Sequence, residues 1–104
     1  MKHQYRVIIN GEEFPFITQN EWGNITIQTD ILEQMLCKVV RFKIKFCHGS
    51  RITGKGTFVY GAGGNKDSII IITDDRQMNR KIDMRFTFGD IAYNMDYFLM
   101  EVLE

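Results

Sequence analysis

Apolar and polar residues alternate over much of this chain, and the alternation is clearest between residues 39 and 47. There, the apolar side chains of Phe42, Ile44 and Phe46 alternate with the basic side chains of Arg41, Lys43 and Lys45. A repeat of two places successive side chains on opposite faces of a strand. The pattern therefore predicts a half-buried strand whose solvent face is basic.

The N-terminal region predicts a β-hairpin. Residues 5–9 and 14–18 favour strands, and Asn10-Gly11 between them is a strong signal for a tight turn. Pro15 has no backbone N–H, so we expect the returning strand to lie at a sheet edge or to lose its pairing there. Residues 20–24 predict a further turn.

A short strand and a helix are expected next. Ile25 and Ile27 alternate with polar neighbours, which predicts a strand. Asp30, with Glu33 three residues later, is typical of a helix N-terminus. We therefore predict a helix over residues 30–38.

The second half of the chain predicts an antiparallel meander. Its strand-like segments are separated by turn-rich sequence and cover residues 39–47, 52–60, 68–73 and 80–88. Residues 69–72 are all isoleucine, which favours a strand covered on both faces, by the hairpin or the helix. Residues 91–103 fit either a helix or a strand, and we expect a helical turn at 90–94 followed by a strand.

This order of elements resembles that of the Sm-like and SH3-like small barrels. The shared order is a helix, a long strand, a glycine-containing turn, a strand with internal glycines, an apolar strand, a further strand, a short FGDI turn and a final strand. The resemblance implies a mainly β (α+β) fold in one domain, residues 1–104, with a small antiparallel barrel over residues 30–104. Residues 1–29 would then be an N-terminal hairpin and strand extension. A likeness of fold alone implies no function.

Length and composition are those of one globular domain. The chain has 104 residues, of which 44% are hydrophobic and 25% are charged. The sequence shows neither a secretory leader nor an apolar run of about 20 residues, which predicts a cytoplasmic location. Cys37 and Cys47 lack the spacing of a redox site, and Cys47, His48 and His3 lack the paired spacings of a metal site. We expect two reduced thiols, no metal and no other cofactor.

The formal net charge is zero, but the charges are segregated along the chain. Residues 38–66 contain no acid, and their bases are Lys38, Arg41, Lys43, Lys45, Arg51, Lys55 and Lys66. Residues 67–104 contain eight acids and four bases. The middle of the chain is therefore expected to attract anions.

Residues 49–55 match the G-x-x-x-x-G-K part of a phosphate-binding loop. Such a loop also needs a serine or threonine after the lysine and a helix that begins there. Position 56 is glycine and residues 57–60 favour a strand, so we do not expect a nucleotide site. Gly54 and Gly56 instead predict a strand that bends or lies close to another backbone.

The turn after the basic strand determines which residues face each other across the next pair of strands. A strict two-residue turn would place Ile44 opposite Lys55 and would bury the lysine. We therefore predict a three-residue turn or a bulge, with Phe42 beside Phe58 and Lys45 beside Lys55.

The basic strand and its neighbour supply the candidate binding residues. We expect one solvent face to bind an anionic partner through charge and hydrogen bonds, using Arg41, Lys43, Lys45, Arg51 and Lys55. Lys38 and Lys66 would contribute less. A charged strand that only prevents edge aggregation explains the same residues. Aromatic residues that could stack on nucleobases, or simply pack, are Trp22, Tyr60, Tyr93 and Tyr97.

These features predict a non-catalytic binding or adaptor module that engages an anionic macromolecule, either nucleic acid or an acidic protein surface. The two histidines and two cysteines do not form a catalytic constellation, so we do not expect an enzyme. The alternative is a small phage or mobile-element inhibitor or accessory protein that binds a host nucleic-acid enzyme through protein contacts. Acids that would then occupy a basic site are Asp90, Asp96, Glu101 and Glu104. Pairing of open sheet edges could also produce a homo-oligomer.

Overall fold

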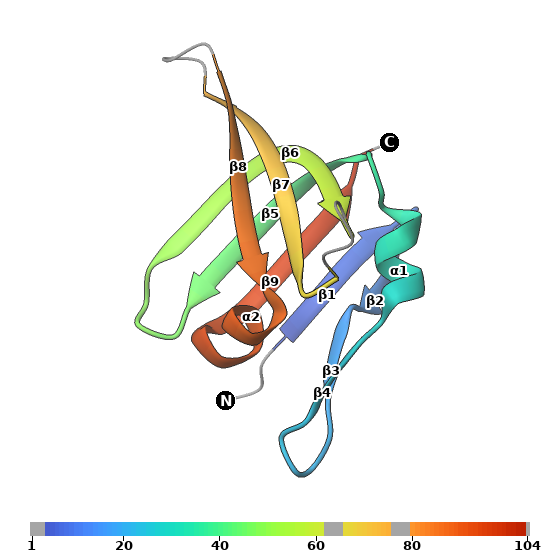
Figure 1. Cartoon of the computed structure of the whole chain (residues 1–104), viewed down its shortest axis with the longest axis vertical. Coiled ribbons are helices and arrows are strands. Elements are labelled where there is room, and N and C mark those ends of the chain that lie inside the picture. The colour runs from blue at the N-terminus through green and yellow to red at the C-terminus, as the bar shows by residue number, and fades with distance from the viewer. Residues whose placement is uncertain (1–3, 62–65, 76–79, 104) are drawn as a thin grey trace.

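The computed structural model describes residues 4–61, 66–75 and 80–103 and consists mainly of β-strands (Figure 1). In chain order its elements are β1 (Gln4–Ile9), β2 (Glu12–Pro15), β3 (Ile17–Gln19), β4 (Ile25–Ile27), α1 (Thr29–Gln34), β5 (Val39–Phe46), β6 (Arg51–Tyr60), β7 (Ser68–Asp75), β8 (Arg80–Thr87), α2 (Phe88–Asn94) and β9 (Met95–Val102). Within the described ranges, neither helix is long and apolar enough to cross a membrane.

Seven strands form one open sheet in the order β2-β1-β9-β5-β6-β7-β8, and β3 pairs only with β4. The strands from β5 to β8 form the predicted antiparallel meander. The fold is mainly β, as predicted, but no closed barrel is found: β1 pairs with β9 in parallel, and the outer edges of β2 and β8 are unpaired in the described part of the chain. The N-terminal hairpin extends the sheet beside β9, so β8 is left without a strand to close against.

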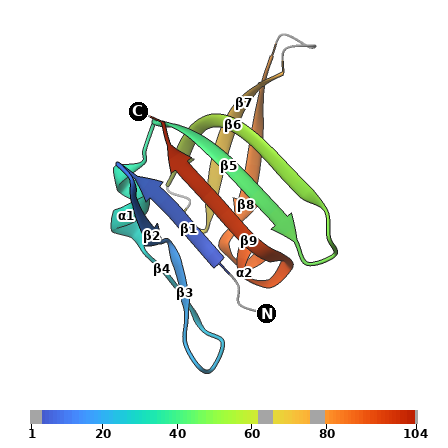
Figure 2. The ribbon, with the colours of Figure 1, turned by 180° about the vertical axis from the view of Figure 1, so that it is seen from behind.

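The sheet folds over itself to enclose the core. Figures 1 and 2 show β7 and β8 crossing over the layer formed by β1, β9 and β5, with α2 at one end of that layer. The ring of Phe98 packs edge-on against those of Phe16 and Phe86, with centroids 5.8 and 5.3 Å apart. Contacts between rings from β8, β9 and the segment after β2 therefore join the two layers.

The N-terminal elements agree with the sequence in position and differ in extent. Asn10 and Gly11 both have positive φ angles, as expected for the tight hairpin turn, and β2 is an edge strand that ends at Pro15. Helix α1 is shorter than predicted, and its N-cap is Gln28, without a side-chain hydrogen bond, instead of Asp30. Cys37 adopts a φ of 64°, a left-handed conformation that ends the helical turns before β5.

The β5–β6 register differs from the predicted one. Phe42 lies opposite Gly54, and Lys45 lies opposite Arg51 instead of Lys55. The turn has three residues, 47–49, as predicted, but it is centred on His48 instead of Ser50: the N–H of Phe46 donates to the carbonyl of Ser50 at 2.8 Å. The observed register still keeps the apolar side chains of β5 on the core side, so periodicity alone did not distinguish it.

The two glycines of β6 allow other groups to approach the strand closely. A Cβ on Gly54 would lie 2.7 Å from the ring of Phe42, and a Cβ on Gly56 would lie 2.5 Å from the carbonyl oxygen of Ile72. The prediction of close backbone approach is therefore confirmed at Gly56. Figure 1 shows β6 curving strongly between its neighbours.

The isoleucine strand is not covered on both faces as predicted. Ile69 and Ile71 are fully buried, whereas Ile70 and Ile72 are half-buried on the other face. Strand β7 lies between β6 and β8, and the hairpin of β1 and β2 lies at the far edge of the same sheet. A run of apolar residues does not reveal which face lacks a second layer.

The close approach at Gly56 gives a test of the fold. We expect Gly56→Ala to lower the free energy of unfolding by about 1–3 kcal/mol, because the new Cβ overlaps the β7 backbone and the Ile71 side chain. The control is Gly89→Ala, since no atom lies within 4 Å of the new Cβ and alanine favours helix α2. Urea unfolding measures both variants. Equal stability of Gly56→Ala and the wild type would contradict this packing.

Candidate polyanion-binding face

The five predicted binding residues lie on one solvent face of β5 and β6, which we call the basic face; its members are Arg41, Lys43, Lys45, Arg51 and Lys55. Arg41 lies directly opposite Lys55, and Lys45 lies directly opposite Arg51. Lys43 lies opposite Thr53. All five are exposed except Lys45, which is half-buried.

Like charges placed opposite each other make this face electrostatically unfavourable. A cross-strand pair of equal charges destabilises a sheet by about 0.2–1 kcal/mol. Strand β9 supplies partial compensation, because Glu101 lies 3.8 Å from Arg41 and Asp96 lies 3.5 Å from Lys45. In the described residues, no carboxylate lies within 4.0 Å of Lys43, Arg51 or Lys55.

A β-bulge directs Asp96 toward the basic face. The pairing of β5 with β9 shifts by one residue after Lys45, and Asp96 is the extra residue at that point. Its side chain is only 13% exposed and contacts both Lys45 and the thiol of Cys47. Loss of Lys45 would leave a half-buried carboxylate without its cation.

Asp96 also acts on the thiol of Cys47. Desolvation, followed by a hydrogen bond and charge repulsion from Asp96, raises the pKa of Cys47. Nucleophilic cysteines need the opposite shift. Cys37 and Cys47 are both free and exposed, and no group of three metal-ligating side chains occurs in the described ranges, from which His3 is absent.

Tyr5 joins the first strand to the segment that precedes β9. Its hydroxyl lies 3.0 Å from the carbonyl oxygen of Ala92 and 2.9 Å from that of Met95, and donates to these acceptors. Burial first, with Cys47 and Asp96 as smaller causes, raises the pKa of Tyr5 to about 12. The buried ring and its hydroxyl thus hold β1, α2 and β9 in one arrangement.

An apolar strip runs beside the basic face. Its members, on β1 and β9, are Ile8, Tyr97 and Leu99, each half-buried. Leu99 lies opposite Lys43 and Tyr97 lies opposite Lys45. A shallow hollow of about 160 Å³ lies between Ile8, Leu99 and the stems of Arg41 and Lys43. This strip could not be predicted from the sequence, because it depends on the pairing of β1 with β9.

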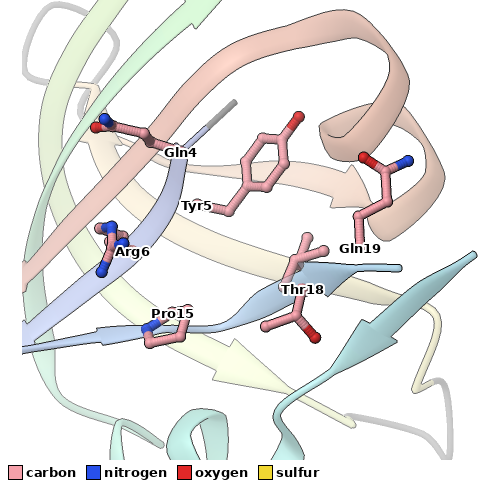
Figure 3. A pocket seen from close by; sticks show the side chains of 7 residues that line it. Gln4, Tyr5, Arg6, Pro15, Thr18 and Gln19 are labelled. Carbon is pink, nitrogen blue, oxygen red and sulfur yellow. The ribbon is translucent and has the colours of Figure 1, made fainter. Parts of the chain in front are cut away.

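A second hollow of about 400 Å³ separates β1 from β3. Figure 3 shows Gln4, Pro15, Thr18 and Gln19 around it, and the ring of Tyr5 pointing toward α2. Arg6 is also at its margin and pairs with Glu13 of β2 at 3.4 Å. This gap lies where the chain passes from β2, which pairs with β1, to β3, which pairs with β4.

The other candidate residues are dispersed. Lys38 and Lys66 lie outside β5 and β6, and Lys55 is in the middle of β6, where no phosphate-binding loop or helix is present. Among the aromatic candidates Tyr60 is buried, whereas Trp22 and Tyr93 are exposed on other elements. Asp96 and Glu101 already contact bases of this chain, Asp90 lies on α2, and Glu104 lies outside the described residues.

Comparison with protein-family models, curated proteins and solved structures finds no significant match.

Ionisation of Tyr5 should couple stability to alkaline pH. An unfolded tyrosine has a pKa of about 10, whereas the folded value for Tyr5 is about 12. The contribution of Tyr5 to the free energy of unfolding is thus present below pH 10 and is lost as pH rises from about 10 to 12. We expect Tyr5→Phe to lower the free energy of unfolding by about 1–2 kcal/mol at neutral pH, because the hydrogen bonds are lost. Above pH 10, the free energy of unfolding of this variant should fall less steeply than that of the wild type.

Urea unfolding at several pH values measures this difference. The matched control is Tyr93→Phe, since the Tyr93 side chain is 65% exposed. This control should follow the wild type throughout. If Tyr5→Phe declined in parallel with the wild type between pH 10 and 12, Tyr5 would not be the coupled group.

Proposed function

We propose that this protein is a non-catalytic binding module whose basic face engages an anionic macromolecule, with a nucleic-acid backbone as the favoured partner. The observation that carries the proposal is the alignment of all five bases on one face of two adjacent strands. Two like-charged pairs face each other there, at a cost to the free chain. A bound polyanion would remove that cost.

The spacing of the bases favours a linear array of charges. Alternate residues of a strand lie about 6.6–6.8 Å apart, so Arg41, Lys43 and Lys45 form a regular row. Phosphates of a nucleic acid also repeat along a line, and lysine and arginine neutralise them without base specificity. Tyr97 and Leu99 lie beside this row and add a surface on which a base or ribose could pack.

Alternative partners receive less support. An acidic protein surface would satisfy the same charges, and it is the partner to pursue if nucleic acid does not bind. The inhibitor hypothesis assigned partner contacts to acids of the C-terminal region. Asp96 and Glu101 instead pair with Lys45 and Arg41, so these carboxylates serve the basic face of their own chain.

The sharpest variant removes the three bases of the face that have no carboxylate within 4.0 Å among the described residues: Lys43→Gln, Arg51→Gln and Lys55→Gln combined. Lys45 is kept because Asp96 depends on it. The wild type should bind single-stranded DNA or RNA with an affinity that falls steeply with salt. In the variant, the plot of log K against log salt should be less steep. The absolute value of its slope should fall by about 2, because each lost contact with a single-strand phosphate removes roughly 0.7.

A matched control changes the same amount of charge elsewhere, through Lys38→Gln, Lys66→Gln and Arg85→Gln. This control should keep most of the wild-type salt dependence of log K, although its net charge equals that of the test variant. Titration by fluorescence anisotropy at several salt concentrations measures all three proteins. Absence of binding at low salt by folded wild type would contradict a nucleic-acid partner, and equal losses in both variants would contradict the basic face as the site.

A further inference from the structure

Strand β8 forms one edge of the seven-stranded sheet. It pairs with β7 on one side, and no strand pairs with its other side in the described part of the chain. Figures 1 and 2 show β7 and β8 extending beyond the ends of the other strands. An unpaired edge presents backbone N–H and C=O groups that can bind a further strand.

The pairing with β7 shows which residues of β8 direct their backbone groups outward. The N–H of Phe88, directly after β8, donates to the carbonyl of Asp67 at 3.0 Å. Hydrogen-bonded positions alternate along an antiparallel pair, so the even-numbered residues of β8 bond to β7. The odd-numbered residues, which include Asp83 and Arg85, therefore direct their N–H and C=O groups away from β7. A strand that joins this edge must bond to the odd-numbered residues.

The two edges of the sheet differ in the features that prevent further pairing. Strand β2 has only four residues, ends at Pro15 and includes Glu12 and Glu13, and short, charged or proline-containing edges resist the addition of a strand. Strand β8 has eight residues and no proline, and its pairing with β7 continues without a bulge. The β8 edge is therefore the one suited to bind another strand.

The side chains of β8 form a charged row and an apolar row. Asp83 and Arg85 are exposed on the outer face of the sheet. Met84 and Phe86 are half-buried and pack against the core, and Ile82 in the same row is 36% exposed. Among the described residues, no group of opposite charge lies within 4.0 Å of Asp83 or Arg85. Both charges and the Ile82 side chain are thus available to a strand that joins the edge.

These side chains make β8 complementary to a second copy of itself. In an antiparallel pair of two β8 strands, odd-numbered residues face each other only if the two-fold axis passes at a residue. An axis at Asp83 would place two aspartates opposite each other, and an axis at Arg85 would place two arginines opposite each other. An axis at Met84 places Asp83 opposite the partner's Arg85, twice by symmetry. Ile82 then lies opposite the partner's Phe86, and pairs of both kinds stabilise a sheet.

We propose that two copies of this protein form a two-fold symmetric dimer through antiparallel pairing of their β8 strands, with the axis at Met84. The paired stretch is residues 81–87 of each copy, and an axis nearer either end of β8 would shorten it. The contact occupies the β8 edge of both copies, so it closes as a dimer.

The expected dimer is weak and leaves the basic face uncovered. A single pair of strands is a small interface, so we expect a Kd on the order of 100 μM. Strand β7 separates β8 from β6, so β5 and β6 lie outside the contact. Dilute titrations of the basic face therefore report on the monomer, and the two proposals succeed or fail separately.

Sedimentation over a concentration series measures association, and urea unfolding checks that each variant folds. Asp83→Arg should weaken association by at least about 10-fold, because both charged cross-strand pairs become repulsive. Arg85→Asp should weaken association for the same reason. The matched control, Glu21→Arg, makes the same change of charge at an exposed turn and should dimerise like the wild type.

The combined variant, Asp83→Arg with Arg85→Asp, separates the register from a general effect of charge. It exchanges the two charges, keeps the net charge and restores opposite charges in both pairs, so it should dimerise about as well as the wild type. A wild type that stays monomeric at about 1 mM, or a dimer that Asp83→Arg does not weaken, would overturn the proposal. A folded combined variant that fails to dimerise would overturn the register.

Amide hydrogen exchange tests the backbone contacts of the dimer. At low concentration, the N–H groups of Asp83 and Arg85 should exchange rapidly, whereas that of Met84, which bonds to β7, should exchange slowly. At high concentration, the N–H groups of Asp83 and Arg85 should become protected as the dimer forms. A dimer in which these two N–H groups still exchange rapidly would rule out pairing of the β8 edges.

Discussion

The parallel pairing of the first strand with the last determines the remainder of this structure. Once β1 occupies one edge of β9, β9 must place its other edge against β5, which brings Asp96 and Glu101 beside the bases of that strand. The hydrogen bonds from the Tyr5 hydroxyl to the carbonyls of Ala92 and Met95 add to this pairing from the buried side. Residues separated by most of the chain are therefore joined, a feature that generally slows folding.

The same pairing explains how a face of like charges is tolerated. Without β9, Arg41 and Lys45 would face Lys55 and Arg51 with no compensating acid from the neighbouring strand. With β9 in place, the register at Glu101 and the bulge at Asp96 bring one carboxylate beside Arg41 and one beside Lys45. In the described residues, Lys43, Arg51 and Lys55 have no carboxylate within 4.0 Å, so the basic face is neutralised only in part.

The sequence predicted local features well because they depend on neighbouring residues. The alternation from Arg41 to Phe46 identified the strand and its basic face, Asn10-Gly11 identified the turn, and the short helix before the final strand was found. Long-range pairing is a different matter, because no local pattern states that β1 lies beside β9. The barrel prediction failed for that reason.

The register of β5 and β6 failed for a related reason. Three-residue turns at more than one position keep Phe42 and Ile44 on the core side, so alternation cannot select among them. The two glycines of β6 do not reveal the register from the sequence alone. The structure shows their roles: Gly54 lies under the ring of Phe42, and Gly56 lies against the backbone of β7. The candidate residues were correctly placed on one face even so, because a register shift by an even number of residues leaves each side chain on its face.

Mapping by nuclear magnetic resonance would show whether a polyanion binds on the outer surface of β5 and β6. Isotope-labelled protein would be titrated with a short single-stranded oligonucleotide at low salt while backbone amide signals are followed. We expect saturable shifts concentrated at Lys43, Arg51, Thr53 and Lys55, with little change along β7 and β8. Shifts confined to other strands, or no shifts at saturating oligonucleotide, would rule out a polyanion site on this face.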